Sequence, residues 1–235
     1  MEFFNAILAE IKSDCAWEQI PYNKISALAR LCGPAEIDHL IRELDDLDDT
    51  DLVGDAGDMG DEYWRLRTSY SQALAEVGEP AIEPLLRALE SANPNTRSYS
   101  ATALGRIGTP RAFDPIVALL SSERQDITRI SLIGSLGDLR DERAVEILLP
   151  FLKSPEQVNR GWMIRMAANA LGKIGTKEVI GPLRAVLEND PDWFARLGAA
   201  EGLCEIRHPS AKFALQSALL DEDARVREVA SAGLR

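Results

Sequence analysis

The sequence predicts an all-α protein, an α-solenoid of stacked helical hairpins, and three observations lead to this prediction. A short pattern, clearest at 101–108 as Ala-Thr-Ala-Leu-Gly-Arg-Ile-Gly, recurs along the chain. Most of its copies begin 30 to 35 residues apart. Leucine and small residues hold fixed places within each copy. Self-similarity at such a period is typical of repeat proteins, in which neighbouring hairpins bury a shared core.

Each repeat is defined by a key position, which Gly105 occupies in the clearest copy. The residue before the key is always leucine, the residue two before it is small, and the residue two after it is aliphatic wherever the chain continues that far. The first two keys are 46 residues apart and the later ones 30 to 35. We therefore expect about six to seven helical hairpins, the first and last incomplete. The keys are Ala29, Ala75, Gly105, Gly137, Gly172, Cys204 and Arg235.

The segment at 1–22 precedes the repeats, and we expect it to be an N-terminal capping helix. A terminal repeat has a neighbour on one side only, so an amphipathic helix is needed to cover its open face. The repeats then fill 23–235. The apolar residues that fall on one stripe of the capping helix are Phe3, Phe4, Ile7, Leu8 and Ile11.

The extra residues between the first two keys form an acidic loop insertion at about 45–62. It holds nine Asp and Glu residues and no Lys or Arg, and so carries most of the net charge of −12. Asp49, Asp51 and Gly54 match an EF-hand calcium loop, but Gly60 stands where the chelating glutamate is required. Two interpretations stay open: a solvated, disordered insertion, or an electrostatic arm for a basic partner.

Composition excludes several function classes. The net charge of −12 and the pI near 4.7 oppose binding to a phosphate backbone, so we expect no nucleic acid. No apolar run approaches the roughly 18 residues of a membrane span, and the N-terminus lacks a signal peptide's basic region. The three cysteines form no CxxC pair and are expected to be free thiols in a reducing compartment. The sequence predicts a cytoplasmic protein without a membrane partner.

The repeat reads Arg-x-x-Ala-x-x-Ala-Leu-Gly-x-Ile-Gly, followed by Ala-x-x-Pro-Leu. This pattern resembles the HEAT-like repeat of the phycobilisome (PBS) lyase family over roughly 23–235, and most clearly at 97–120 and 165–187. Members of that family include bilin lyase subunits, phycobilisome-degradation factors and many adaptor proteins. The resemblance implies an α-solenoid that holds another protein, and bilin chemistry is one of the functions that the family offers.

The sequence contains no catalytic or metal-binding constellation. The two histidines, His39 and His208, belong to no His-Glu pair and have no metal-ligand spacing with cysteine. A di-iron hydroxylase built on HEAT repeats is therefore excluded for lack of ligands. We expect no catalytic residue, no metal ion and no cofactor, and only a lyase function would add a bilin.

The first candidate binding surface is acidic. Glu83, Asp114 and Glu146 take matching places early in successive second helices. They should stack as a stripe on the surface that these helices share, which in HEAT-like folds is the concave one. The stripe is either a solvated face or the place where a solenoid meets its partner.

The second candidate surface is aromatic. Trp64, Trp162 and Trp193 stand ten or eleven residues before their keys, at the entrance to first helices. Each is either a hydrophobic staple that closes an inter-repeat loop or part of an aromatic edge that binds a partner.

Arginine also recurs at a fixed place, eight residues before the key, and Arg165 stands one place later than the others. Each head group is expected to pair with a neighbouring repeat's carboxylate or with a helix C-terminus, while its stem packs along the first helix. A ligand groove lined with arginines is the alternative. The arginines in register are Arg67, Arg97, Arg129, Arg196 and Arg227.

Two functions follow from these observations. The first is a non-catalytic adaptor or scaffold whose solenoid surface holds a partner protein, with a phycobiliprotein among the candidates. The alternative, implied by the family resemblance, is a bilin lyase or isomerase subunit, or a phycobilisome-degradation factor, acting on phycobiliproteins. Because bilin propionates are anionic, an acidic groove would repel them unless arginines reach into it.

The acidic insertion should be dispensable for folding. When Asp48–Asp61 is replaced by a short Gly/Ser linker, the melting temperature should change little, because loop length enters stability only logarithmically. Circular dichroism during heating measures this. A collapse in stability would show that the insertion is packed and would rule out the disordered interpretation.

Overall fold

The computed structural model describes residues 2–16, 22–46, 61–153 and 159–235. These residues form helices joined by turns, with no strand among them, which confirms the predicted fold class. In the part of the chain so described, no helix is long and apolar enough to cross a membrane. The acidic insertion lies mostly outside these residues, and its order stays a prediction.

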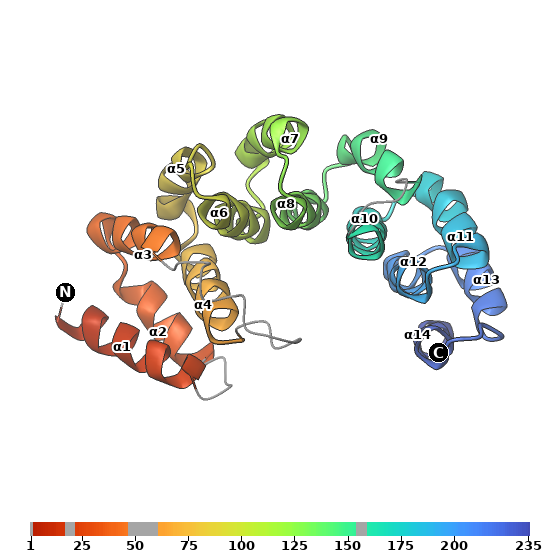
Figure 1. Cartoon of the computed structure of the whole chain (residues 1–235), viewed down its shortest axis with the longest axis horizontal. Coiled ribbons are helices and arrows are strands. Elements are labelled where there is room, and N and C mark those ends of the chain that lie inside the picture. Colours follow the sequence, from red (N-terminus) through yellow and green to blue (C-terminus); the bar gives the residue numbers. More distant parts are fainter. Residues whose placement is uncertain (1, 17–21, 47–60, 154–158) are drawn as a thin grey trace. The chain divides into compact units, whose positions relative to one another are not determined.

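The chain divides into two compact units, 1–115 and 116–235, and each is described by itself. In the first unit, α1 packs against α2 and α4, and α6 packs against α3, α4 and α5 (Figure 1). The place of α1 suits the capping role expected of 1–22, which stays a prediction. The helices of this unit are α1 (Glu2–Ala16), α2 (Tyr22–Leu31), α3 (Pro34–Asp46), α4 (Asp61–Val77), α5 (Glu79–Ala88) and α6 (Pro94–Ile107).

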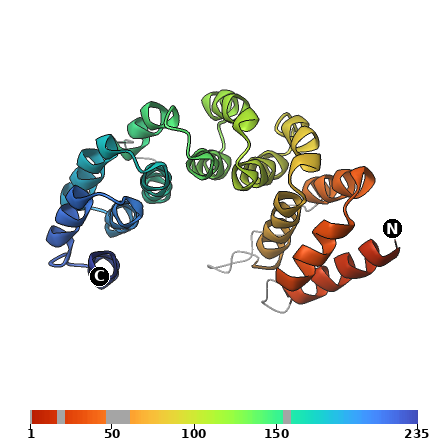
Figure 2. The ribbon, with the colours of Figure 1, turned by 180° about the vertical axis from the view of Figure 1, so that it is seen from behind.

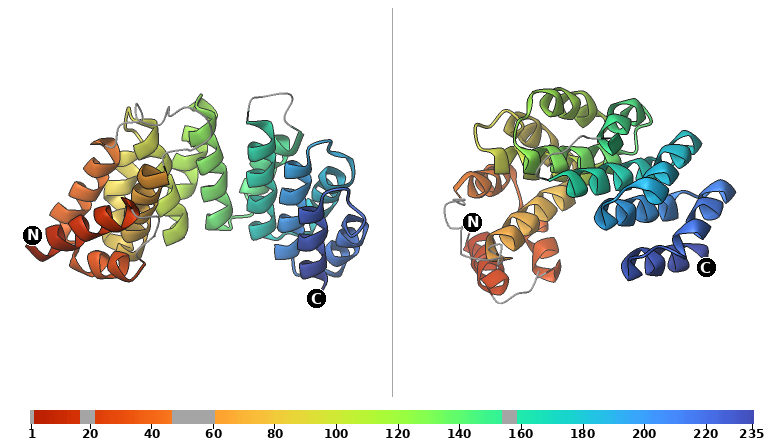
Figure 3. Two further views of the ribbon diagram at one scale, coloured as in Figure 1. Left: turned by 60° about the horizontal axis from the view of Figure 1, so that its bottom comes forward. Right: turned by 45° about the vertical axis from the view of Figure 1, so that its right-hand side comes forward.

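The boundary falls within α7 (Phe113–Ser122), and the second unit contains three and a half hairpins after it. Its first helices α8, α10, α12 and α14 follow one another in one row, while α9, α11 and α13 form a second row on their outer side (Figures 1 and 2). Figure 3 shows that the helices within the first row lie side by side. The helices are α8 (Asp126–Leu139), α9 (Ala144–Leu148), α10 (Arg160–Ile174), α11 (Ile180–Asn189), α12 (Trp193–Glu205), α13 (Pro209–Ala218) and α14 (Ala224–Leu234).

Several first helices begin at a side chain that caps the N-terminus. Asn93, Asp192 and Asp223 each accept a hydrogen bond from the backbone N–H two residues later, at 2.8 to 2.9 Å. Such a cap satisfies one of the free N–H groups of the first helical turn. At the other end, Gly108 and Gly175 follow α6 and α10 with φ of 72° and 77°, a conformation that glycine adopts without strain.

The key positions are explained by the approach of successive first helices. A Cβ atom on Gly172 would lie 2.4 Å from the carbonyl oxygen of Gly202, and one on Gly137 would lie 2.5 Å from Cα of Ala170. Gly202 and Ala170 are the small residues two places before the next key. The same relation brings Gly233 against the thiol of Cys204. The key of one repeat therefore packs against the small position of the next.

The arginines eight residues before the key tether the turn that precedes their own helix. In Arg97, Arg196 and Arg227, Nη1 donates to the carbonyl oxygens six and five residues earlier, at 2.6 to 3.2 Å. These carbonyls belong to the turn that joins the preceding second helix to the helix of the arginine. These three arginines therefore bind the turn beyond the end of the second helix, and not the C-terminal carbonyls of the helix that were expected from the sequence.

Arg196 also ties its repeat to the next one. Its Nε and Nη2 donate to the two carboxylate oxygens of Asp221 at 2.8 and 3.0 Å, and both side chains are 7% exposed. Burial of Asp221 disfavours its charged form, but hydrogen bonds from Arg196 and from the N–H of Asp223 outweigh burial and lower its pKa. The pair therefore holds α12 to the turn before α14.

Gly172→Ala should destabilise the protein, because its Cβ would meet the backbone of α12. Overpacking of this kind costs about 1–3 kcal/mol. The matched control is Gly181→Ala in α11, where a Cβ meets nothing within 4 Å. The control should be neutral or stabilise the protein by about 0.4–1 kcal/mol. Urea unfolding measures both, and equal effects would contradict the packing of key against small position.

Candidate functional site

The acidic residues predicted from the sequence lie on second helices and are exposed. Glu83 on α5 and Asp114 at the start of α7 belong to the first unit, and Glu146 on α9 belongs to the second. Glu83 forms an ion pair with Arg111, which lies in a short 3-10 helix. A partner-binding role for these residues stays a prediction.

The expected concave placement of the acidic stripe is wrong for the second unit. There, the second helices form the outer row, and Glu146 on α9 belongs to it (Figure 1). The physical reason is the key contact, which brings first helices so close that Gly172 meets the backbone of Gly202. A stack bends toward the row whose members approach most closely. The inner face of this unit is therefore made by first helices.

Two of the three predicted tryptophans meet in one aromatic cluster. The ring of Phe194 on α12 lies 4.7 Å from the ring of Trp162 on α10 and 5.2 Å from that of Trp193, both in edge-to-face geometry. Edge-to-face pairs are the arrangement that aromatic quadrupoles favour. The side chain of Trp64, the third predicted residue, lies outside the described residues. Binding by these tryptophans stays a prediction.

The environments of the two tryptophans differ. The guanidinium carbon of Arg225 lies 3.3 Å from the ring centre of Trp193, and Asp223 holds this guanidinium through two hydrogen bonds of 3.0 and 2.7 Å. Trp193 is thus covered on one face. Among the described residues no guanidinium lies over the ring of Trp162, which is 51% exposed.

Arg165 stands one residue later in its repeat than the other recurring arginines do, and the structure shows why. The place eight residues before Gly172 belongs to Ile164, which is fully buried, and Arg165 falls between α10 and α12, where its Cα and stem pack against Gly198. Its guanidinium lies 4.5 Å from the ring centre of Phe194 and donates to both carboxylate oxygens of Glu201 at 2.9 and 2.6 Å. We call Trp162, Arg165, Phe194 and Glu201 the α10–α12 cluster.

The sequence singled out Trp162 and Arg165 but missed the other two members. Phe194 and Glu201 follow the repeat pattern without any unusual feature, and they matter through contacts with a helix about 30 residues away. The one signal that could have found them was the late position of Arg165. An arginine shifted by one residue cannot bind the same groups as the other recurring arginines. Its partner would be expected on the next first helix, on the side that faces the arginine.

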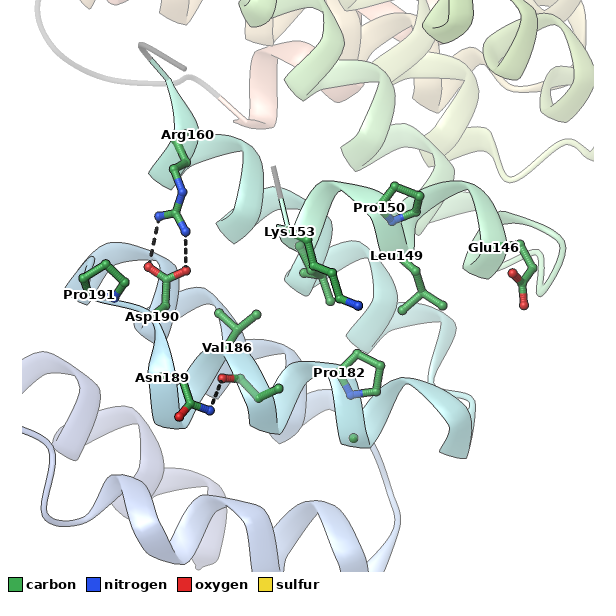
Figure 4. Close-up of a pocket in the computed structure, with 13 residues that line it drawn as sticks. Glu146, Leu149, Pro150, Lys153, Arg160, Pro182, Val186, Asn189, Asp190 and Pro191 are labelled. Carbon is green, nitrogen blue, oxygen red and sulfur yellow. Dashed lines mark hydrogen bonds and ion pairs between the residues drawn. The ribbon is translucent and has the colours of Figure 1, made fainter. Parts of the chain in front are cut away.

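An open groove of about 750 Å³ lies on the other row of the second unit, between the 3-10 helix Leu149–Lys153 and α11 (Figure 4). At one end, Arg160 donates to Asp190 at 2.6 and 3.0 Å, so these charges neutralise each other. The apolar lining includes Leu149, Pro150, Pro182 and Val186.

Neither described thiol is an activated nucleophile. Burial, helped by the charge of Glu36, raises the pKa of Cys32 to about 11. Burial, followed by the charges of Glu205 and Glu201, raises the pKa of Cys204. A raised pKa leaves little thiolate, which is the reactive form. The side chain of Cys15 lies outside the described residues.

The paired helices and their key contacts define an α-solenoid of the HEAT type. The model for HEAT repeats matches residues 59–136, 82–165, 125–204 and 162–235. Together with the relatives reported next, this match places the chain in the HEAT-repeat family, among proteins with the phycobilisome lyase type of HEAT-like repeat.

The curated relatives carry bilin-related names. The chain is 30% identical over 157 residues to the bilin biosynthesis protein PecF of Nostoc sp. (strain PCC 7120 / SAG 25.82 / UTEX 2576), across 63% of this chain and 90% of the relative. It is 29% identical over 110 residues to the phycocyanobilin lyase subunit beta of the same strain, across 42% of this chain and 52% of the relative. The second match therefore spans only about half of that relative.

Two solved structures are similar over most of the chain. One is the complex of CpcE and CpcF of phycocyanin lyase from Nostoc sp. PCC7120, with 20% identity, a TM-score of 0.44 and coverage of 86% of this chain and 100% of that chain. The other is human deoxyhypusine hydroxylase in complex with glycerol, with 18% identity, a TM-score of 0.43 and coverage of 99% and 95%.

The two kinds of arginine should differ in their effect on stability. Arg196→Gln leaves the carboxylate of Asp221 buried without its cation, and breaking such a pair costs about 3–5 kcal/mol. Arg165→Gln breaks a pair whose side chains are each 26% exposed, so its cost should be about 1 kcal/mol or less. Urea unfolding at pH 7 compares the two variants, and an equal loss would contradict the distinction.

The pH dependence of stability shows whether the loss in Arg196→Gln comes from the ion pair with Asp221. Because the folded pKa of Asp221 is lowered, its contribution is present above the unfolded Asp pKa of about 3.9 and is lost as pH falls through the folded pKa. The stability gap between the parent and Arg196→Gln should therefore narrow below about pH 4. A gap that stays constant down to pH 2 would show that packing, not charge, is lost.

Proposed function

We propose that this protein is a subunit of a bilin lyase, which binds an apo-phycobiliprotein and a bilin and promotes attachment of the bilin. The observation that carries the proposal is the match to PecF, which covers 90% of that relative at 30% identity. The matches to two phycocyanobilin lyase beta subunits, from Nostoc and from Thermosynechococcus vestitus, support the same substrate class.

In this proposal the chain binds and orients its substrates. The raised pKa values of Cys32 and Cys204 leave neither described thiol suited to form a covalent intermediate with the bilin. The protein-binding character expected from the sequence is therefore kept, but it serves bilin attachment. The relatives favour this alternative over an adaptor that acts on no chromophore.

The protein partner would meet the solenoid on exposed charged and aromatic surfaces. Glu83, Asp114 and Glu146 offer carboxylates to a basic partner, and charges of this kind mainly speed association. Trp162 offers the large, exposed ring that is enriched among residues dominating binding energy. We keep these residues as candidates for contact with the apo-phycobiliprotein.

Covalent attachment tests the proposal directly. Apo-phycocyanin subunits are produced in cells that make phycocyanobilin, with and without this chain, and each condition is repeated with a companion lyase subunit. We expect more covalently bound bilin on one phycocyanin subunit when the chain is present, detected as fluorescence that survives a denaturing gel.

Bilin fluorescence equal with and without the chain, in the presence of the companion subunit, would reject the lyase proposal. If the chain then still captured apo-phycocyanin, the adaptor hypothesis would replace it. The control is the parent chain with Gly181→Ala, a change in open space on α11 that should leave attachment unchanged.

A further inference from the structure

We propose that the α10–α12 cluster is a bilin-binding site, in which the conjugated rings of the bilin lie against Trp162, whose ring is held by Phe194, and one propionate accepts a hydrogen bond from Arg165. This inference rests on the proposed function and assigns it to a place in the fold. Three features of the cluster support it: a guanidinium held beside aromatic rings, the exposed ring of Trp162, and an Arg165 donor that no described residue uses.

The first feature is the position of the Arg165 guanidinium, which lies against Phe194 and Glu201 of α12. In α12, a single residue, Arg196, both tethers its own turn and pairs with Asp221 of the next repeat. In α10 the pairing with the next repeat is made by Arg160, which holds Asp190, the residue equivalent to Asp221. Because Arg160 makes the tie to Asp190, Arg165 pairs with α12 instead, and its guanidinium lies beside the aromatic rings of the cluster.

The second feature is the aromatic surface. Trp162 is 51% exposed although Phe194 holds its ring in edge-to-face contact at 4.7 Å. A tryptophan that only closed a loop would be covered, as Trp193 is by Arg225. A fixed and half-open indole offers a flat apolar face, which is what a conjugated ring system needs.

The third feature is the donor capacity of Arg165. Its Nε and Nη2 bind Glu201, and among the described residues Nη1 has no hydrogen-bond partner. The guanidinium can therefore donate to a second carboxylate. Glu201 is also held by Asn169, whose Nδ2 donates to it at 3.0 Å, so the cation is fixed in place before a ligand arrives.

The ligand chemistry follows from these features. An open-chain tetrapyrrole combines conjugated rings with two carboxylates, and the cluster offers rings beside a guanidinium. Hydrogen bonds between an ionised donor and a carboxylate are the stronger kind. Glu201 neutralises the charge of Arg165, so the ligand carboxylate is held by the remaining Nη1 donor and not by a net positive charge.

The experiment is a titration of the full chain with phycocyanobilin, followed by the shift of its visible absorption band and by quenching of tryptophan fluorescence. Trp162→Leu and Trp193→Leu make the same change on the open and the covered ring. We expect affinity to fall roughly tenfold for Trp162→Leu, and to stay within about twofold for Trp193→Leu.

The charge is tested by two further variants and a modified ligand. Arg165→Gln should weaken binding of phycocyanobilin roughly tenfold, the size expected for a lost charge-assisted hydrogen bond. Glu201→Gln should strengthen it, because a competing carboxylate is removed while the cation remains. The dimethyl ester of phycocyanobilin, which lacks both negative charges, should bind the parent and Arg165→Gln equally. Thermal melts confirm that each variant is folded.

The outcomes separate this inference from the proposed function. If Trp162→Leu and Arg165→Gln bind phycocyanobilin as tightly as the parent, or if the parent does not bind it, the assigned site is wrong. The lyase proposal would then be tested by the attachment assay with apo-phycocyanin alone. If the variants behave as expected but no bilin is attached to phycocyanin, the site stands and the lyase proposal fails.

Discussion

The row of first helices depends on one close contact, in which the key residue of a repeat packs against the small residue two places before the next key. A side chain added there would overlap the backbone of the neighbouring helix, so residue size at these two places sets the helix spacing. The contact occurs three times in the second unit, which explains why both positions vary only among small residues and cysteine. The pairs are Gly137 with Ala170, Gly172 with Gly202, and Cys204 with Gly233.

The same contact explains which parts of the fold the sequence could predict. A contact that recurs once per repeat requires the same residue types at the same place in every repeat. The hairpins, their key positions and the recurring arginines could therefore be identified from spacing alone. The direction in which the stack bends could not be predicted. The repeat spacing shows which helices are neighbours, but it does not show whether first helices or second helices approach each other more closely. The analogy used for the acidic stripe therefore failed at Glu146, whose helix α9 belongs to the outer row of its unit.

The candidate site was predicted only in part, for a related reason. Trp162 and Trp193 were found because they hold equivalent places, but equivalence could not show that Arg225 covers one and leaves the other open. Phe194 and Glu201 conform to the repeat and gave no signal of their own. Their roles come from the pairing of α10 with α12, which no local pattern contains.

A repeat scaffold can tolerate a local exception when another residue takes over the structural task. In α12 a single arginine, Arg196, tethers its own turn and binds the carboxylate of the next repeat. In α10 the second task belongs to Arg160, and the buried place is filled by Ile164. The key contact of Gly172 still fixes the helix, and Arg165 adds a further contact between α10 and α12 through Gly198 and Glu201. Regularity in this fold thus identifies the residues that build the scaffold, and the late position of Arg165 identifies an arginine whose partner lies on the next first helix.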